Sequence, residues 1–237
     1  MDTQTATPRL RRAYFESRYG QLHVHNAIPS GGGFDELTTL ICLHASSSSG
    51  RMFLEVSRIL GTSRSIYSPD IPGCGESDSP PGPLPITGYA DAIGDFLDSM
   101  RFRQIDLLGA HSGAAVAAEL AIARPKLVRR IVMVGAPALT ADERRTYREL
   151  SAPEDTPRGA LWARSAVIEW DAEKRLPLLK QPLLVLRPRD NFWEAGGRVT
   201  KLTAGAKVID LPDHDRNLLD KAPDLVARHL ASFLGGG

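Results

Sequence analysis

The chain has 237 residues, of which 24% are charged and 42% hydrophobic, and its formal net charge is +1. This length suits one α/β domain with a large core, so we take residues 1–237 as a single domain. The near-neutral charge gives no electrostatic reason to expect nucleic acid or a membrane surface as partner. Residues 1–10 lack the apolar segment of a signal peptide and no run reaches transmembrane length, so we expect a cytoplasmic protein.

The first part of the chain reads as strands. Residues 12–27 alternate in short stretches and predict two antiparallel strands with a tight turn. Residues 38–43 are a continuous apolar run, typical of a strand covered on both faces, and they end at His44-Ala45. Residues 65–68 fit another short strand. Cys42 falls in a strand and Cys74 in a loop, so we predict no disulfide framework.

Helical and extended patterns alternate along the rest of the chain. Residues 86–101 carry apolar side chains at helical spacing, and residues 224–234 form the last helical pattern. Between them, apolar runs at 128–134, 182–186 and 207–210 predict buried strands. Strands that alternate with helices imply a mostly parallel sheet with its chemistry at the carboxyl ends of the strands.

The most informative segment is residues 105–121, which reads as a strand, a sharp turn and a helix of small residues. Its turn is Gly109-Ala110-His111-Ser112-Gly113. Upstream, residues 70–78 read Asp-Ile-Pro-Gly-Cys-Gly-Glu-Ser-Asp, a specific loop motif.

These two motifs resemble the α/β-hydrolases, whose nucleophile elbow is Gly-x-Ser-x-Gly and whose loop motif is Asp-x-Pro-Gly-x-Gly-x-Ser. His44-Ala45 is similar to the His-Gly that begins the oxyanion loop of that family. The resemblance implies the α/β-hydrolase fold, a mostly parallel twisted sheet flanked by helices. It also places His111 where the family has its serine. A histidine tolerates the positive φ of the elbow tip, but it has no hydroxyl to offer a carbonyl carbon.

A competing register stays open, because Ala110-His111-Ser112-Gly113-Ala114 is a small-x-Ser-x-small sequence centred on Ser112. We favour His111 as the elbow residue, since the apolar positions on both flanks then fall where the family has them.

The resemblance also locates the other two triad positions. The acid position falls on Asn191, with Asp190 immediately before it, and the histidine position falls on Arg216, with His214 two residues earlier. All three positions therefore depart from serine, acid and histidine, which indicates that hydrolytic chemistry has been lost or replaced.

Each of these residues also has an ordinary structural interpretation. Arg216 would pair with Asp190, Asp213 or Asp215 at the surface. Asn191 would stabilise a turn through its own backbone. His111 would be a relic in a pocket without chemistry. His23 and His25 share a strand face, but one His-x-His pair is weak evidence for a metal, so we predict neither metal nor cofactor.

Residues 137–181 are short for the lid that the family inserts over its pocket. Thr140-Ala-Asp-Glu143 reads as a capping box that opens a charged helix, and residues 159–170 as a second helix. We therefore expect a reduced lid and an open pocket.

Three functions follow. The first is a non-hydrolytic enzyme, a lyase, isomerase or cyclase of bacterial secondary metabolism, that acts on a small organic substrate. In it His111 carries protons, and the loop after His44 (Ala45 and Ser46) together with Ser112 polarises an oxygen, as the resemblance implies. Arg216 holds an anionic group.

The second is a serine esterase or thioesterase that uses Ser112, His214 and Asp190. The third is an inactive scaffold that binds a ligand or partner. A small molecule is the expected partner, and a homodimer is possible.

Overall fold

The computed structural model describes residues 7–31, 37–150 and 152–235. Within them one eight-stranded sheet runs in the order β1-β2-β4-β3-β5-β6-β7-β8. The pairs β1–β2 and β2–β4 are antiparallel, and all later pairs are parallel. The strands are β1 (Arg9–Ser17), β2 (Gly20–Ile28), β3 (Leu37–Leu43), β4 (Arg64–Pro69), β5 (Ile105–Ala110), β6 (Val128–Val134), β7 (Leu183–Pro188) and β8 (Lys207–Leu211).

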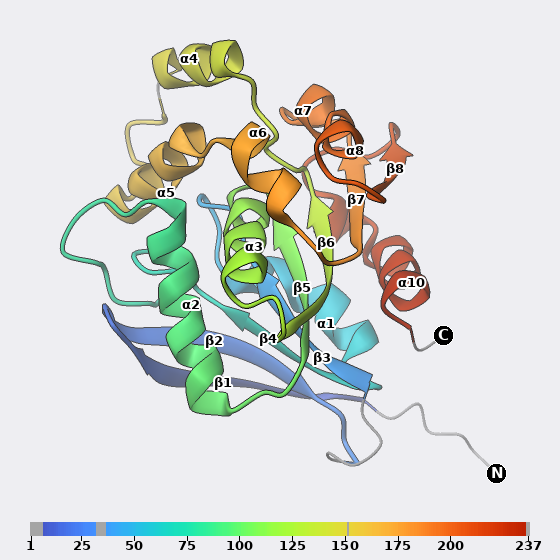
Figure 1. Cartoon of the computed structure of the whole chain (residues 1–237). Coiled ribbons are helices and arrows are strands. Elements are labelled where there is room, and N and C mark those ends of the chain that lie inside the picture. The colour runs from blue at the N-terminus through green and yellow to red at the C-terminus, as the bar shows by residue number, and fades with distance from the viewer. Residues whose placement is uncertain (1–6, 32–36, 151, 236–237) are drawn as a thin grey trace.

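Helices cover both faces of the sheet (Figure 1). The α-helices are α1 (Leu54–Leu60), α2 (Ile86–Met100), α3 (Ser112–Ala123), α4 (Ala141–Glu149), α5 (Arg158–Glu169), α6 (Ala172–Arg175), α7 (Trp193–Gly197), α8 (Val199–Leu202), α9 (Leu218–Lys221) and α10 (Pro223–Leu234). Two short 3-10 helices are η1 (Gly50–Phe53) and η2 (Leu176–Leu178).

The core has two layers because successive strand residues point to opposite faces. Ile41 and Leu43 of β3 pack in the layer that α2 and α3 cover, whereas Leu40 and Cys42 pack in the layer that α1, α9 and α10 cover. The continuous apolar runs of the parallel strands are therefore explained by burial on both sides. The small side chains of α3 let it lie close against the sheet, and all ten residues from Ser112 to Ala121 are buried.

The predicted elements are present, with shifted ends. The two N-terminal strands and the strand at 128–134 are confirmed, and the run at 182–186 extends to Pro188. The helix at 86–101 ends at Met100, because Arg101 adopts a left-handed conformation with φ of 54°. Helix α1 and the short helices α6 to α9 were not predicted from the sequence. Both cysteines are free and buried.

The lid segment lies beyond the carboxyl ends of the central strands (Figure 1). Its helix α4 begins with the predicted capping box, in which Thr140 accepts from the Glu143 backbone and the Glu143 side chain accepts from the Thr140 N–H. Arg198 of α7–α8 pairs with the Glu143 carboxylate and so fastens α4 to the body. Helix α5 buries Ala163, Val167 and Ile168 against the core.

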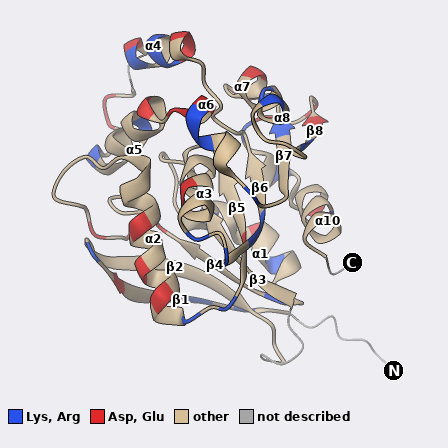
Figure 2. Cartoon of the chain, in the orientation of Figure 1, with Lys and Arg blue, Asp and Glu red and all other residues tan. Residues whose placement is uncertain are grey.

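Charged residues of both signs are distributed over the elements, including side by side on α4 (Figure 2). No helix in the described ranges combines the length and the apolar character needed to span a bilayer. Residues 1–6 of the N-terminal segment considered above lie outside the described residues.

Candidate active site at the elbow

The turn between β5 and α3 is a strained elbow with His111 at its tip. His111 has φ of 51° and ψ of −114°, and α3 begins at the next residue, Ser112. A positive φ costs a non-glycine residue conformational energy, and it is held here because the His111 N–H donates to the Val134 carbonyl at 2.9 Å. The strained position therefore belongs to His111 rather than to Ser112.

The flanking glycines are required by close backbone approaches. A Cβ on Gly109 would lie 2.5 Å from the Gly113 carbonyl oxygen, and one on Gly113 would lie 2.0 Å from the Leu43 carbonyl oxygen. Only glycine fits at both places. The Gly-x-His-x-Gly spacing thus follows from the packing of the elbow against β3.

The His111 imidazole forms a pair with a buried carboxylate. His111 Nε2 lies 2.9 Å from Asp190 Oδ2, and the two side chains are 20% and 2% exposed. Because an ionised carboxylate only accepts hydrogen bonds, Nε2 carries the proton and the Nδ1 lone pair is left over. Among the described residues Nδ1 has no hydrogen-bond partner.

Asp190 is held in place by its own loop. Its second oxygen, Oδ1, accepts from the Phe192 N–H at 2.8 Å, an Asx-type turn after β7. Gly135, after β6, leaves the necessary space, since a Cβ there would meet His111 Cδ2 at 2.4 Å and Asp190 Oδ2 at 2.5 Å. The carboxylate that faces the elbow is therefore Asp190, one residue before the position that the resemblance indicated, Asn191.

Two aromatic side chains complete the immediate surroundings. The Phe192 ring meets the His111 ring edge to face at 5.4 Å, and the Tyr147 ring stacks on Phe192 at 5.8 Å. The Tyr147 hydroxyl donates to the Asn191 carbonyl at 2.6 Å, which ties lid helix α4 to the loop that carries Asp190. Burial raises the pKa of the Tyr147 hydroxyl. The lid thus helps position the His111–Asp190 pair.

The pair opens into a cavity of about 710 Å³ between the lid and the carboxyl ends of the strands. Ser46 and Ser47 line it from the loop after β3, and Arg216 and Asn191 line it from the loops after β8 and β7. The cavity brings together the loops after β3, β7 and β8, the elbow and the lid segment, as expected for a site at the carboxyl edge of a parallel sheet.

The alternative set of Ser112, His214 and Asp190 is not brought together. Ser112 is 3% exposed, and its Oγ accepts from the Ser46 N–H at 2.6 Å. The carboxylate of Asp190 faces His111, while His214 uses its backbone to pair with Leu211 and Arg189. In the described ranges neither Ser112 nor His214 lines the cavity.

The loop after β3 differs from the expectation for His44. The His44 side chain is buried, its Nδ1 donates to the Ala45 carbonyl at 2.7 Å, and its Nε2 accepts from the Ile71 N–H at 2.9 Å. Both nitrogens are therefore used within the protein, and His44 holds loops instead of contacting a ligand. Burial lowers the pKa of His44 and keeps it neutral.

The backbone donors of this region are mostly engaged. The Ala45 N–H points to Met52 Sδ at 3.4 Å, and the Ser46 N–H binds Ser112. The Ser112 N–H lies in the first turn of α3, where no carbonyl four residues earlier is available to it. Ser112 is buried and does not line the cavity, so the polarisation of a substrate oxygen by its N–H stays a prediction.

Arg216 is exposed at the cavity and, within the described chain, forms no ion pair. Of the three carboxylates considered as its surface partners, Asp190 is paired with His111 and Asp215 with Lys221 at 2.7 Å, and Asp213 forms no ion pair with Arg216 in the described chain. The interpretation of Arg216 as a surface ion pair therefore does not describe this structure.

A family model described as the alpha/beta hydrolase family matches residues 40–234. The chain belongs to the α/β-hydrolase family. This confirms the resemblance drawn from the elbow and from the loop at residues 70–78.

Solved structures share the fold of this α/β-hydrolase over nearly the whole chain. A hydrolase from Pseudomonas aeruginosa superposes with a TM-score of 0.79 at 19% identity, covering 95% of this chain and 99% of that one. An enol-lactonase from Burkholderia xenovorans gives 0.78 at 16% identity, covering 94% and 99%. An esterase from Exiguobacterium antarcticum gives 0.78 at 17% identity, covering 94% and 98%.

Curated relatives match only a part of this chain. Uncharacterized proteins of Mycobacterium tuberculosis and Mycobacterium bovis are 31% identical over 88 residues, which is 37% of this chain and 26% of their own length. The matched stretch thus spans about a quarter of those relatives.

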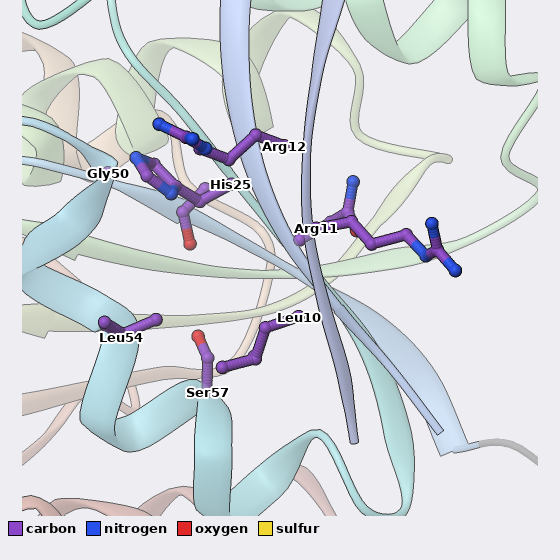
Figure 3. A pocket seen from close by; sticks show the side chains of 9 residues that line it. Leu10, Arg11, Arg12, His25, Gly50, Leu54 and Ser57 are labelled. Atoms are coloured by element: carbon purple, nitrogen blue, oxygen red, sulfur yellow. The ribbon is translucent and has the colours of Figure 1, made fainter. Parts of the chain in front are cut away.

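A second histidine–carboxylate pair lies away from the elbow of this α/β-hydrolase. His23 Nδ1 is 2.9 Å from Asp70 Oδ2, both side chains are 1% exposed, and the His25 ring meets the His23 ring at 4.6 Å. One atom from each of these three side chains lies within 4.8 Å of the others, a spacing that could hold a metal ion. His25 also lines a separate cavity of about 370 Å³ between β1 and α1 (Figure 3).

Several residues of the elbow site were not identified from the sequence. Phe192 and Tyr147 pack around His111, and Gly135 makes room for it. The one available signal was Tyr147, a large aromatic side chain in an otherwise charged helix. Gly135 carried no signal, since its role depends on two side chains that are distant in the sequence.

Proposed function

We propose that this α/β-hydrolase family member is a non-hydrolytic enzyme, in which the His111–Asp190 pair transfers a proton during elimination, cyclisation, isomerisation or ring opening of a small organic substrate. The observation that carries the proposal is the 2.9 Å contact of His111 Nε2 with the buried Asp190 carboxylate, at the tip of the elbow and on the wall of a cavity. General acid–base groups are most often histidines held in this way.

The proposed mechanism uses the two ring nitrogens separately. Asp190 accepts from Nε2–H, which fixes the tautomer and stabilises the imidazolium that forms when Nδ1 takes a proton. The proton removed from the substrate then returns from Nδ1 to another atom of the same molecule or leaves with a departing group. The Ser112 N–H remains the proposed donor to a substrate oxygen on which negative charge develops, and this requires the substrate to reach the first turn of α3 behind His111.

The burial of Ser112, the serine of the elbow, supports a non-hydrolytic reaction. Ser112 Oγ is buried as the acceptor of the Ser46 N–H, and Asp190 is engaged with His111 instead of with His214. A serine esterase would need Ser112 to leave this bond and face the cavity.

A second candidate is hydrolysis by a water molecule that His111 deprotonates. It is favoured because the solved structures that share this fold include proteins described as an esterase and an enol-lactonase. The same pair would act as general base, with water in place of a C–H acid. Binding without catalysis is the remaining outcome.

The experiment is a screen for proton exchange. The wild-type protein is incubated in D₂O with small lactones, 1,3-dicarbonyl compounds and hydroxy acids, and deuterium incorporation is followed by NMR. We expect exchange or a non-hydrolytic product, which His111→Ala abolishes while the fold survives. Incorporation of ¹⁸O from labelled water into a cleaved product would favour the hydrolytic candidate. Labelling of Ser112 by a fluorophosphonate would contradict the proposal.

A further inference from the structure

The cavity at the elbow carries positive charge that the protein does not neutralise. Three arginines, Arg164, Arg189 and Arg216, line it together with two aspartates, Asp190 and Asp215. Asp215 is already paired with Lys221, which does not line the cavity, so of the two aspartates only Asp190 is left to set against the three guanidinium groups. The lining therefore favours a negatively charged group on the bound molecule.

The hydrogen-bond and ion-pair partners of the three arginines show which guanidinium groups are available to bind a ligand. The Arg164 guanidinium donates to the Leu150 carbonyl at 2.7 Å and to the Tyr147 carbonyl at 3.3 Å, so it holds the lid. In the described part of the chain neither Arg189 nor Arg216 has a carboxylate partner. Arg189 lies over the Trp193 ring at 5.3 Å, a contact that orients its guanidinium without neutralising it.

These two arginines stand on loops that are fastened together. Arg189 follows β7 and Arg216 follows β8, and the Arg189 N–H donates to the His214 carbonyl at 2.7 Å. This bond draws the two loops to one side of the cavity. Two guanidinium groups on a joined rim can bind a carboxylate with paired N–H···O bonds, which a lysine could not copy.

The rest of the lining is largely apolar. Leu139, Leu150 and Ile168 come from the lid segment, and Phe192 forms the wall beside His111. A bound molecule would bury a hydrocarbon or aromatic part against these side chains while its charged end stays at the rim.

We propose that the substrate of this site is an amphipathic monocarboxylic acid, with its carboxylate at Arg189 and Arg216 and its apolar part between the lid and Phe192. This rests on the proposed function only in that the reacting proton of such an acid would lie at His111. The binding itself requires no chemistry, so it can be measured separately.

Calorimetric titration tests the proposal with hexanoate and 3-phenylpropanoate as probes, and with hexanamide and hexyl phosphate as comparisons. We expect both carboxylates to bind at least about tenfold more tightly than the amide, since a charged hydrogen bond is worth about 1.5–3 kcal/mol. Arg189→Gln and Arg216→Gln should each weaken carboxylate binding about 10–100-fold. Arg228→Gln, an exposed position on α10, is the control for net charge and should leave binding unchanged.

Several results would overturn the proposal. These are equal binding of hexanamide and hexanoate, tighter binding of hexyl phosphate, arginine variants with wild-type affinity, or no carboxylate binding at millimolar concentration. His111→Ala separates this inference from the proposed function. If it binds carboxylates as the wild type does and neither protein exchanges protons, the catalytic proposal fails and the carboxylate site stands. If proton exchange is seen only with neutral compounds and carboxylates do not bind, the catalytic proposal stands and the carboxylate site fails.

Discussion

Two histidine–aspartate pairs in this protein have the same contact distance and opposite surroundings. His23–Asp70 and His111–Asp190 are both 2.9 Å apart, but the first pair is 1% exposed on both sides, whereas the His111 side chain is 20% exposed at a cavity. His23 stands on regular strand β2, and His111 stands on a backbone with positive φ. The pairing alone therefore does not make a site.

The carboxylates of the two pairs, Asp70 and Asp190, also differ in the hydrogen bonds that they accept. Asp70 accepts from the backbone N–H groups of Gly50 at 2.6 Å and Glu76 at 2.9 Å in addition to His23, so it joins three segments of the chain. Asp190 accepts from one backbone N–H in its own loop and gives its other oxygen to His111. We infer that the first pair stabilises the fold and that the second positions a proton-transfer group.

The largest expected effect comes from Asp190→Asn. The amide keeps the bond from the Phe192 N–H but presents an NH₂ to His111 Nε2, which places the ring proton on Nδ1 and removes the free base. Proton exchange on the best compound of the screen should fall about 10²–10⁴-fold, the range of general acid–base groups. The melting temperature should change little. An Asp190→Asn protein with full exchange activity would show that the two pairs do not differ in the way we infer.

Asp70→Asn is the matched change in the other pair. It removes charge-assisted bonds from three donors in a buried place, so the free energy of unfolding should fall by about 2–5 kcal/mol. Denaturant unfolding measures this loss. The exchange rate per folded molecule should stay near that of the wild type, measured well below the new melting temperature. Loss of activity at unchanged stability would contradict the assignment.

Gly135→Ala should lower both the stability of the fold and the rate of proton exchange. The new methyl group would lie 2.4 Å from His111 Cδ2 and 2.5 Å from Asp190 Oδ2, and the backbone there has φ of 63°. Strain of about 1–3 kcal/mol is expected from the conformation, and the His111–Asp190 contact must widen. Denaturant unfolding would measure the loss of stability, and the proton-exchange assay would measure the loss of activity. The control is Gly82→Ala, at an open position where no atom lies within 4 Å of the added methyl group.

The example of Gly135 shows where prediction from the sequence ends. Periodicity and the elbow and loop motifs predicted where the strands lie along the chain and that His111 stands at the elbow, because each signal lies within about twenty consecutive residues. The acid position of the family was placed on Asn191, one residue after Asp190, since counting from a strand cannot show that Asp190 closes an Asx turn. Phe192, Tyr147 and Arg189 meet at the cavity only through the tertiary fold.

Ser112→Ala should have a modest effect on stability and none on chemistry. It removes the acceptor of the Ser46 N–H, a bond at 2.6 Å, and should lower the free energy of unfolding by about 1–2 kcal/mol. Because Ser112 does not line the cavity, weak activity on activated esters should be unchanged. A large loss of esterase activity in this variant would show that Ser112 is the nucleophile. The inferred difference between the His111–Asp190 and His23–Asp70 pairs would then fail.

The smallest expected effect is a dependence of stability on pH that involves His44. Burial lowers the pKa of this histidine in the folded protein, whereas the unfolded chain takes up a proton near the ordinary value of about 6.5. Its contribution is therefore complete above that value and is lost as the pH falls below it, by about 1 kcal/mol at one pH unit lower. Denaturant unfolding at several pH values should show this slope, and His44→Asn should flatten it. Because His44 bonds only to the protein backbone, this variant should keep carboxylate binding, and loss of binding would place His44 in the site.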